Sequence, residues 1–456
     1  MSRIPSIAIY DIGKTNKKVF LFDESYRIIW EDSTQLEETT DEDGFPCEDL
    51  KALENWIRKS FDLASSLDGV EIRALNFSGY GASFVNLGKD NRPITPLYNY
   101  LKPFPQAIEQ SFYSKYGGPE KFARVTASPR LGNLNSGLQL LRLRMEKPAF
   151  FHQILHALHL PQWLSFLFTN QFVSDMTSIG CHTAMWNFKE KKYHEWLEKE
   201  RILQVLAPIS PSEKTFKIVK SGKELISGIG LHDSSAALTP YLLQSKESFL
   251  LISTGTWSIS LNPFNRLELT QEELSNDCLC YLDFKGNQVK ASRLFAGQLH
   301  DQLVLQLAEH FQVSEKYFQQ LIFDSRWCLS LDNPDFDNSF LPAGEILNSF
   351  NPDRYKTPEE GYHQLMTALI LLQKKSTEFI LGKGNVKSIF VDGGFSKNSV
   401  FMNLLALVFK KYRVYAARVA QASAIGAAMA IHEAWNKTPL VENLVSLQSF
   451  SRDAAS

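Results

Sequence analysis

The sequence has no long hydrophobic run, no surplus of one charge and few cysteines. No stretch reaches the roughly 18 apolar residues of a membrane-spanning helix, and residues 1–13 lack the continuous apolar segment of a signal peptide. With 48 basic and 50 acidic residues the formal charge is −2, which disfavours nucleic acid and acidic membranes as partners. We therefore expect a cytoplasmic protein that binds neither.

Five cysteines, an odd number, are scattered along the chain, so a disulfide framework is not expected. Cys278 and Cys280 lie close together in the strand-like run CLCYLDF, where residues two apart face the same side. No nearby residues complete a zinc site. We predict that both cysteines pack in the interior.

The remaining composition is that of a globular protein with more than one domain. A chain of 456 residues with 44% hydrophobic and 21% charged residues predicts two or three compact units, and two large ones would leave a cleft between them. Alternating strand-like and helix-like segments predict an α/β fold with mixed sheets covered by helices.

Two similar hairpins are predicted, about 240 residues apart. Residues 6–23 contain an apolar run, a polar turn with glycine and a second apolar run, and residues 249–262 repeat this order. The repeat suggests a duplicated architecture with one hairpin in each half. The polar break YLLQSKES before the second hairpin places the boundary near residue 245, which gives domains 1–245 and 246–456.

Helix-like periodicity marks several segments between and after the hairpins. His152, His156 and His159 share one face of a helix predicted over residues 151–168. Because no carboxylate supports them, a partly buried helix face is favoured over a metal site. Small residues at helical spacing in residues 422–435 predict close helix packing, and Trp257 is predicted to be a core residue.

The first hairpin offers the groups that phosphoryl transfer requires: donors around the phosphates and a carboxylate for a divalent metal. Its tip has backbone N–H groups and a hydroxyl suited to phosphate oxygens, and Asp11, at the end of the first strand, is suited to hold Mg²⁺ through water. The alternative is a purely structural turn. The residues of the predicted phosphate site are Gly13, Lys14, Thr15, Asn16 and Lys18.

Two further segments supply similar groups. Thr254, Gly255 and Thr256 at the second hairpin offer hydroxyls and a close backbone approach. Gly393 and Gly394 follow a strand and precede a helix, which leaves an open backbone surface for adenine or ribose. A turn needed only for packing is the alternative for this glycine pair.

Asp233 stands in the run GIGLHDSSAAL, after a bend with glycine and before a predicted helix. As a simple N-cap it would accept hydrogen bonds from the N–H groups of the helix. A helix N-terminus also keeps a carboxylate ionised, which a base that accepts a hydroxyl proton requires. The residues alone allow both roles.

Taken together, five motifs resemble the FGGY family of carbohydrate kinases over nearly the whole chain. The resemblance implies two ribonuclease-H-like domains of the actin and hexokinase superfold around a cleft, with ATP and Mg²⁺ as cofactors and a sugar as substrate. The motifs are DIGKTNKK (11–18), GLHDSSA (230–236), STGTWS (253–258), DGGFSKN (392–398) and AQASAIGAA (420–428).

The resemblance also implies roles for individual residues. Asp233 is the catalytic base, and Asp11 and Asp233 are the candidate metal ligands. The residues implied to bind phosphates and adenosine are Gly13, Lys14, Thr15, Asn16, Lys18, Gly255, Thr256, Gly393, Gly394, Phe395 and Asn398.

The expected sugar site departs from the family pattern. The motifs STGTWS, LHDSSA and SGYGASFVNL are most similar to the rhamnulokinase and fuculokinase branch, which favours a deoxyketose such as L-rhamnulose or L-fuculose. The segment PLYNYLK (96–102), however, lacks the acid and the arginine that usually contact the sugar. Packing is the alternative for the tyrosines. The candidate sugar-site residues are Gly81, Ala82, Phe84, Tyr98, Asn99, Tyr100, Lys102, His232 and Asp233.

We therefore expect an ATP-dependent sugar kinase in which closure of the two halves brings the acceptor hydroxyl to Asp233. The altered sugar segment motivates one alternative, a catalytically inactive sugar- or nucleotide-binding regulator of the same fold. A second alternative, an ATPase chaperone or filament protein of the superfold, has no support in the motifs. A homodimer is compatible with the sequence.

Overall fold

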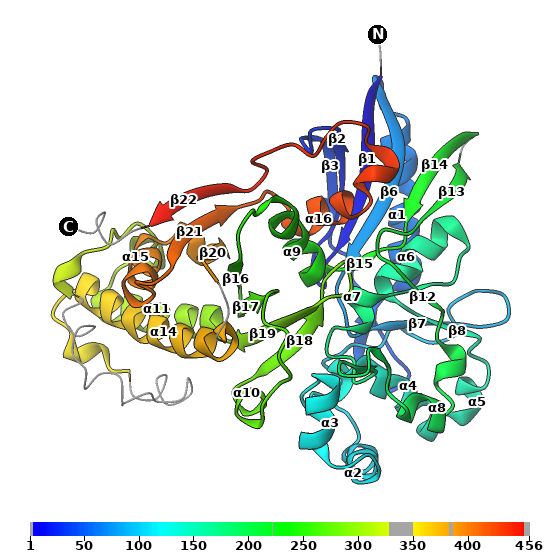
Figure 1. Ribbon diagram of the computed structural model, residues 1–456, viewed down its shortest axis with the longest axis horizontal. Coiled ribbons are helices and arrows are strands. Elements are labelled where there is room, and N and C mark those ends of the chain that lie inside the picture. Colours follow the sequence, from blue (N-terminus) through cyan, green and yellow to red (C-terminus); the bar gives the residue numbers. More distant parts are fainter. Residues whose placement is uncertain (1–2, 221, 328–349, 383–385, 451–456) are drawn as a thin grey trace.

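The computed structural model describes residues 3–220, 222–327, 350–382 and 386–450. Cys328 lies outside these ranges. The described chain forms two mixed sheets with helices packed against them, the N-terminal sheet on the right of Figure 1 and the C-terminal sheet on the left. The expected α/β class with two sheet-centred halves is confirmed. Within the described ranges, no helix combines the length and the apolar character needed to cross a bilayer.

The N-terminal sheet has the strand order β13-β14-β6-β1-β2-β3, and β15 adds to β6. β1 pairs antiparallel with β2 and parallel with β6, so the first hairpin forms as predicted. The strands of this sheet are β1 (Ile4–Ile12), β2 (Lys17–Asp23), β3 (Ile28–Thr34), β6 (Val70–Gly79), β13 (Thr215–Lys220), β14 (Lys223–Gly228) and β15 (Leu231–His232).

The C-terminal sheet repeats this arrangement in the order β18-β19-β17-β16-β20-β21-β22. β16 pairs antiparallel with β17 and parallel with β20, as β1 does with β2 and β6. The predicted duplication is therefore confirmed. The strands of this sheet are β16 (Phe249–Thr254), β17 (Ser258–Asn262), β18 (Cys278–Leu282), β19 (Gln288–Leu294), β20 (Ser388–Gly393), β21 (Arg413–Arg418) and β22 (Ser446–Phe450).

Helices cover the faces of both sheets. Several begin at a side chain that accepts hydrogen bonds from the first free N–H groups: Asp49 caps α1, and Asn398 caps α15. The described helices of eight or more residues are α1 (Leu50–Ser65), α2 (Gln106–Lys115), α3 (Pro119–Thr126), α4 (Ser136–Glu146), α6 (Leu160–Thr169), α9 (Asp233–Gln244), α11 (Ala296–Phe311), α14 (Pro358–Leu381), α15 (Ser399–Val408) and α16 (Ala422–Ala430).

Short elements complete the described chain. The short helices are α5 (Pro148–Phe151), α7 (Met176–Ile179), α8 (Trp196–Lys199), α10 (Gln271–Ser275), α12 (Glu315–Gln319) and α17 (His432–Trp435). The short strands are β4 (Glu38–Thr40), β5 (Pro46–Glu48), β7 (Phe84–Leu87), β8 (His156–His159), β9 (Ser174–Asp175), β10 (Trp186–Asn187), β11 (Lys192–Tyr193) and β12 (Ile209–Ser210). The 3₁₀ turns are η1 (Gly132–Leu134), η2 (Leu203–Val205), η3 (Ser325–Trp327), η6 (Pro352–Arg354) and η7 (Gly394–Lys397).

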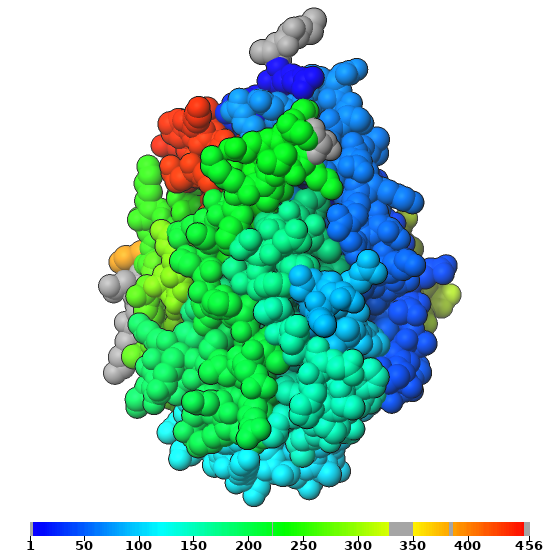
Figure 2. Space-filling view, turned by 90° about the vertical axis from the view of Figure 1, so that its right-hand side faces the viewer, coloured from blue at the N-terminus to red at the C-terminus, as the bar shows by residue number. Residues whose placement is uncertain are grey.

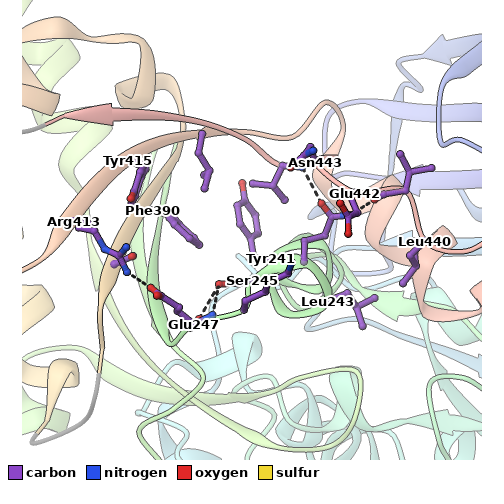
Figure 3. A pocket seen from close by; sticks show the side chains of 16 residues that line it. Tyr241, Leu243, Ser245, Glu247, Phe390, Arg413, Tyr415, Leu440, Glu442 and Asn443 are labelled. Carbon is purple, nitrogen blue, oxygen red and sulfur yellow. Dashed lines mark hydrogen bonds and ion pairs between the residues drawn. The ribbon is translucent and has the colours of Figure 1, made fainter.

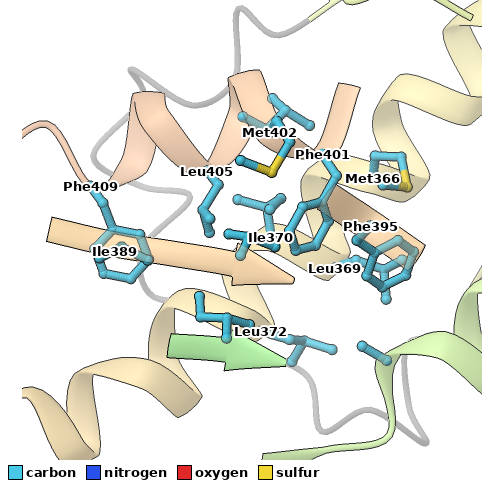
Figure 4. Close-up of a cluster of buried hydrophobic side chains, with 14 of the residues drawn as sticks. Met366, Leu369, Ile370, Leu372, Ile389, Phe395, Phe401, Met402, Leu405 and Phe409 are labelled. Atoms are coloured by element: carbon cyan, nitrogen blue, oxygen red, sulfur yellow. The ribbon is translucent and has the colours of Figure 1, made fainter. Parts of the chain in front are cut away.

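The C-terminal core lies between the sheet and the helices α14 and α15. Figure 4 shows Ile370 of α14 and Leu405 of α15 packed against Ile389 of β20, all fully buried. Cys278 and Cys280 are also buried in this cluster, as predicted. Packing of this kind fixes the end of β20, from which the Gly393 turn projects.

The helix predicted over residues 151–168 is wrong in its first part. His156–His159 forms strand β8, which pairs with β7, and α6 begins only at Leu160. His159 is buried and its ring stacks on Phe84 at 4.0 Å, whereas His156 stacks on Phe172 at 3.7 Å. A short apolar run is ambiguous between strand and helix, and here the pairing with β7 decided it.

The chain returns to the N-terminal sheet near its C-terminus. Helix α16 packs on β1, β6 and α9. Figure 2 shows an orange-red surface patch from the last part of the chain beside the blue N-terminal part. A Cβ added at Gly426 would lie 1.8 Å from the carbonyl oxygen of Ala236, so α16 and α9 cross in close contact as the small residues predicted. The division into domains 1–245 and 246–456 stays a prediction; residue 245 falls between α9 and β16.

Candidate active site

The first hairpin places Gly13 to Asn16 at its tip, between β1 and β2. The tip is closed by a hydrogen bond from Gly13 N to Asn16 O at 3.0 Å. Thr15 and Asn16 are exposed, whereas Lys14 forms an ion pair with Glu38. The exposed hydroxyl and free backbone groups are therefore presented to the solvent side of the tip, as a phosphate site requires.

A buried ion pair that the sequence did not reveal supports this tip from below. Lys17 Nζ lies 2.9 Å from Glu48 Oε1, and the two side chains are 2% and 3% exposed. The same ammonium donates to the carbonyl oxygen of Lys14 at 2.9 Å. Tyr80 also donates to Glu48 Oε2 at 3.3 Å. Lys17 thus anchors the tip, while its neighbour Lys18 lies opposite Asp11 in the hairpin register.

Two carboxylates meet at the ends of β1 and β15. Asp11 accepts a hydrogen bond from Ser423 Oγ of α16 at 2.8 Å. The pKa of Asp11 is raised, first by burial and then, against the hydrogen bond from Ser423, by the negative charge of Asp233. Ile12 and His232, the chain neighbours of Asp11 and Asp233, both pair with Gly79 of β6, so the two carboxylates lie at adjacent strand ends.

Asp233 is the first residue of α9 and combines access with a raised pKa. Its side chain is 37% exposed, and Oδ1 accepts a hydrogen bond from Ser234 N at 2.6 Å. Desolvation raises the pKa of Asp233 to about 6. The effect of desolvation is thus larger than that of the helix N-terminus, which was expected to lower the pKa and keep the group ionised. A carboxylate with a pKa near 6 is suited to accept a proton close to neutral pH.

A buried chain of hydrogen bonds holds the residue before Asp233. Thr177 Oγ1 donates to Asp175 and accepts from His232 N at 2.9 Å. Burial lowers the pKa of His232 to about 4, so its ring is neutral. Among the described residues, Nδ1 of His232 has no hydrogen-bond partner, and it lies 3.5 Å from Asp233 Oδ1. His232 therefore has a buried polar atom without a hydrogen-bond partner beside the candidate base.

Gly81 and Tyr100 lie at this end of the site. A Cβ added at Gly81 would lie 2.6 Å from the His232 ring, so only glycine leaves room for the imidazole. Ala82, the next residue, has φ of 58°, and its carbonyl accepts from Gln139 Nε2 at 2.6 Å. The pKa of Tyr100 is raised by burial and by the charge of Asp233, which places Tyr100 near the carboxylate.

The other candidates in residues 96–102 bind elsewhere. The Tyr98 hydroxyl donates to Glu42 Oε1 at 2.5 Å, and Asn99 Nδ2 donates to the carbonyl of Pro46 at 3.1 Å. Lys102 forms ion pairs with Asp41 and Asp43. These contacts give Tyr98, Asn99 and Lys102 a packing role and leave Tyr100, whose pKa the charge of Asp233 helps to raise, as the candidate of this segment for the sugar site. Phe84 is likewise a core residue, only 2% exposed.

The second hairpin tip and the glycine turn form one unit in the C-terminal half. Phe395 N donates to Thr254 Oγ1 at 3.0 Å, and the Thr254 hydroxyl donates to the Asp392 carbonyl at 2.5 Å. Gly255 N donates to the Trp257 carbonyl at 2.8 Å. A Cβ added at Gly297, in the first turn of α11, would lie 2.0 Å from Gly255 O, so this helix packs directly on the tip.

The two glycines of the turn differ in their surroundings. Gly393 has φ of 85°, and an added Cβ would lie 1.8 Å from the carbonyl oxygen of Thr254, so packing alone requires glycine there. Gly394 is exposed, and an added Cβ would meet nothing within 4 Å. The open surface expected for a nucleotide is therefore at Gly394.

Phe395 and Asn398 are used by the fold. Phe395 stacks on Phe401 at 4.6 Å, and Asn398 donates to the Tyr362 hydroxyl at 2.6 Å in addition to capping α15. Both residues therefore hold the glycine turn in place.

Helix α9 connects the two parts of the site. It begins at Asp233, and Tyr241, eight residues later, donates its hydroxyl to Asp392 Oδ2 at 2.6 Å, next to Gly393. Eight residues of helix span about 12 Å. Behind this contact Tyr241 lines a separate cavity of about 470 Å³, together with Phe390 and the ion pair of Arg413 with Glu247 (Figure 3). Asp233 and the glycine turn therefore share one region of the molecule.

Arg293 of β19 faces the N-terminal half from the second sheet. Its Nε and NH2 atoms donate to Asp277 at 3.1 and 2.6 Å, and the guanidinium lies 5.4 Å from the Trp257 ring. Its charge contributes to lowering the pKa of His182 to about 3, after burial as the main cause. Trp257 is 41% exposed, so its predicted place in the core is wrong. The tip of the second hairpin thus carries an accessible aromatic ring, and a cation of the neighbouring strand β19 lies beside it.

Comparison with protein families decides the relationship. Residues 6–234 match the N-terminal domain of the FGGY family of carbohydrate kinases, and residues 246–439 match the carbohydrate kinase FGGY C-terminal domain. The chain belongs to the FGGY family of carbohydrate kinases. Members of this family are phosphotransferases with an alcohol group as acceptor.

Curated relatives of this FGGY chain include rhamnulokinases at low identity. The rhamnulokinase of Bacteroides thetaiotaomicron is 24% identical over 201 residues, which cover 42% of this chain and 41% of that enzyme. That of Klebsiella pneumoniae is 23% identical over 244 residues, or 52% of this chain and 49% of the enzyme. The matched region thus spans less than half the length of these relatives.

Solved structures establish the FGGY fold across nearly the whole chain. A carbohydrate kinase from Novosphingobium aromaticivorans has a TM-score of 0.80 at 21% identity and covers 97% of this chain and 96% of its own. Ligand-bound xylulose kinase from Lactobacillus acidophilus has a TM-score of 0.79 at 17% identity, with 99% and 95% covered. At these identities the likeness concerns the fold alone.

The two carboxylates of this FGGY chain fit a magnesium ion that arrives with ATP. In the described chain neither Asp11 nor Asp233 has a lysine or arginine within ion-pair distance, and the charge of Asp233 raises the pKa of Asp11. No group of three or more His, Cys, Asp or Glu side chains in that part of the chain forms a metal cage. Mg²⁺ commonly takes one or two carboxylates and completes its shell with water and phosphate oxygens.

Four supporting residues of the FGGY site escaped prediction. The burial of Lys17 could have been inferred from the sequence, because side chains alternate between the two faces of a strand and one of two adjacent lysines must therefore point into the core. Ser423 had no such signal, because its partner Asp11 lies 412 residues away. Arg293 and Thr177 have nearer partners, Asp277 and Asp175, but the contact of Thr177 with His232 spans 55 residues. Such contacts follow from the tertiary fold.

Proposed function

We propose that this chain is an ATP-dependent sugar kinase that transfers the γ-phosphate to a hydroxyl of a small ketose. The observation that carries the proposal is the meeting of Asp11 and Asp233 beside the first hairpin tip, with α9 leading from Asp233 to the glycine turn. Family membership supports the same activity. The proposed domains are residues 1–245, which bind sugar and phosphate, and 246–456, which bind the nucleotide.

In this proposal the two hairpin tips hold the phosphates and the open surface at Gly394 receives the adenosine. Mg²⁺ supplies positive charge that offsets the charge of the phosphates; Asp11 would hold it through water, and Asp233, the other candidate ligand, would also contact it only through water, which leaves its carboxylate free to accept a proton. The phosphate contacts proposed on the first tip are Gly13, Lys14, Thr15, Asn16 and Lys18, and those on the second are Gly255 and Thr256. Phe395 and Asn398 shape the adenosine side.

Asp233 acts as the general base toward the acceptor hydroxyl. Its raised pKa, close to 6, supports this role, because the ionised fraction is high at neutral pH while the group keeps affinity for a proton. The buried hydrogen-bond chain from Asp175 through Thr177 to His232 fixes the residue that precedes it. A fixed base lowers the reorganisation needed in the transition state.

The acceptor is proposed to bind at Gly81, Tyr100 and His232, and a deoxyketose such as L-rhamnulose or L-fuculose is favoured. Nδ1 of His232 is buried and has no hydrogen-bond partner in the described chain, so a sugar hydroxyl reaches it only if the site opens, whereas Tyr100 is half-buried. Local motifs and the names of the curated relatives support this substrate class. We assign no sugar contact to Tyr98 and Asn99, because both are bonded elsewhere.

A screen for ADP release across ketoses, aldoses and polyols tests the proposal. A kinase releases ADP only with its sugar, and L-rhamnulose or L-fuculose should rank among the best acceptors. Binding of ATP or sugar with no sugar-dependent ADP release would instead support a catalytically inactive regulator, and ADP release without any sugar would indicate an ATPase.

A further inference from the structure

A second large cavity lies where the two halves of the chain meet. It has a volume of about 930 Å³. One wall comes from the N-terminal half, at the end of α3 and in residues 186–191 and 209–213, and the other from residues 266–269 and 280–288. None of its lining residues belongs to the candidate active site, so it requires a separate explanation.

The walls of this cavity carry an excess of positive charge. Five cations but only two carboxylates line it, in a chain whose formal charge is −2. Lys189 pairs with Glu268 across the two halves at 3.5 Å. The other four, Arg124, Lys191, Arg266 and Lys285, are exposed and have no carboxylate within ion-pair distance in the part of the chain that the structure describes. A concave surface with one sign of charge concentrates ions of the opposite sign.

The lining of the cavity suits an organic molecule. Trp186 and Leu282 belong to it and are only 6% and 3% exposed, so they form a fixed apolar part of the wall. Asn287 and Gln288 add amide groups at the same wall. Ligand pockets of roughly 300 to 1,000 Å³ commonly combine an apolar lining with a few polar groups.

We propose that this cavity binds a small organic polyanion, either a sugar phosphate or a polycarboxylate. The unpaired Arg124 and Arg266 come from opposite halves, and guanidinium groups bind phosphate and carboxylate oxygens in bidentate fashion. A molecule held by both arginines bridges the two halves. The inference stands independently of the proposed kinase activity, because it concerns binding at residues outside that site.

Binding to the full chain tests the inference. With MgAMP-PNP present to occupy the nucleotide site, citrate and ribose 5-phosphate are titrated by calorimetry into the parent and into the double variant Arg124→Gln/Arg266→Gln. We expect at least one probe to bind the parent and to lose affinity about tenfold or more in the variant, since two cations close to the ligand are removed. The bound probe should also raise the melting temperature of the parent.

Lys51→Gln/Lys59→Gln is the matched control, because it removes the same charge from exposed positions of α1. This control should bind the probe as the parent does. Unchanged affinity for MgAMP-PNP shows that both variants are folded. The inference is overturned if neither probe binds the parent, or if the two double variants weaken binding equally. Binding of citrate would indicate a polycarboxylate ligand, binding of ribose 5-phosphate a sugar phosphate, and binding of both a site that accepts either class of anion.

Discussion

The buried pair of Lys17 and Glu48 permits a quantitative prediction. At a separation of 2.9 Å, two unit charges attract with about 6 kcal/mol at an effective dielectric constant near 20. Removing one partner of a buried pair costs about 3–5 kcal/mol, because the remaining charge is left without compensation. That loss is a large part of the roughly 5–15 kcal/mol by which proteins are stable.

We expect Lys17→Met to lower the free energy of unfolding by about this amount, 3–5 kcal/mol, in urea titrations followed by tryptophan fluorescence. Lys17→Met/Glu48→Gln removes the uncompensated charge as well and should recover most of the stability. It does not restore the hydrogen bond from Lys17 to the Lys14 carbonyl at the hairpin tip. Both the single and the double variant should therefore have a KM for ATP about tenfold above that of the parent, because both lack this charge-assisted hydrogen bond.

Lys290→Met is the matched control, because Lys290 of β19 and Glu273 of α10 form a buried pair at 2.7 Å in the C-terminal half. It should lose comparable stability and leave the KM for ATP unchanged. The reasoning is refuted if Lys17→Met unfolds at the same urea concentration as the parent, or if the double variant is no more stable than the single one.

Three further predictions concern the active site. Gly393→Ala should lower the free energy of unfolding, because its Cβ would overlap the Thr254 carbonyl. Gly394→Ala should unfold like the parent but bind ATP more weakly. The account is contradicted if the two variants have the same stability in denaturation and the same ATP affinity in titration. Since only ionised Asp233 accepts a proton, kcat/KM should fall about tenfold per pH unit below its pKa of about 6, and a flat profile from pH 5 to 8 would oppose the assignment. Thr177→Val removes the acceptor of His232 N and should lower kcat without changing ATP affinity; an unchanged kcat would show that this support is unnecessary.

Local patterns predicted the framework of the fold because they depend on neighbouring residues. Alternating apolar residues with a polar turn gave both hairpins, and the small residues of 422–435 predicted the close crossing of α16 and α9. The sequence did not show whether the glycine pair serves packing or ligand binding. In the structure Gly393 is required by packing, whereas Gly394 provides the open surface. A motif does not show which of two adjacent glycines meets a neighbouring backbone.

Features that depend on distant partners escaped prediction. His156 joined a strand because β7 was available for pairing, and Trp257 stayed partly exposed because its ring lies at a hairpin tip beside Arg293. The segment 96–102 was assigned to the sugar as a group, yet Tyr98 donates its hydroxyl to Glu42, whereas the charge of Asp233 helps to raise the pKa of Tyr100. Side-chain direction in a loop is set by the charges that the fold brings near it.

The most direct measurement of the central claim compares sugar-dependent ADP release by the parent and by Asp233→Asn, with ATP affinity measured in parallel. The variant keeps the shape of the side chain and loses the base, so we expect turnover to fall about 10²- to 10⁴-fold with ATP affinity retained. Near-normal turnover of the variant with the sugar that the parent uses would contradict the account.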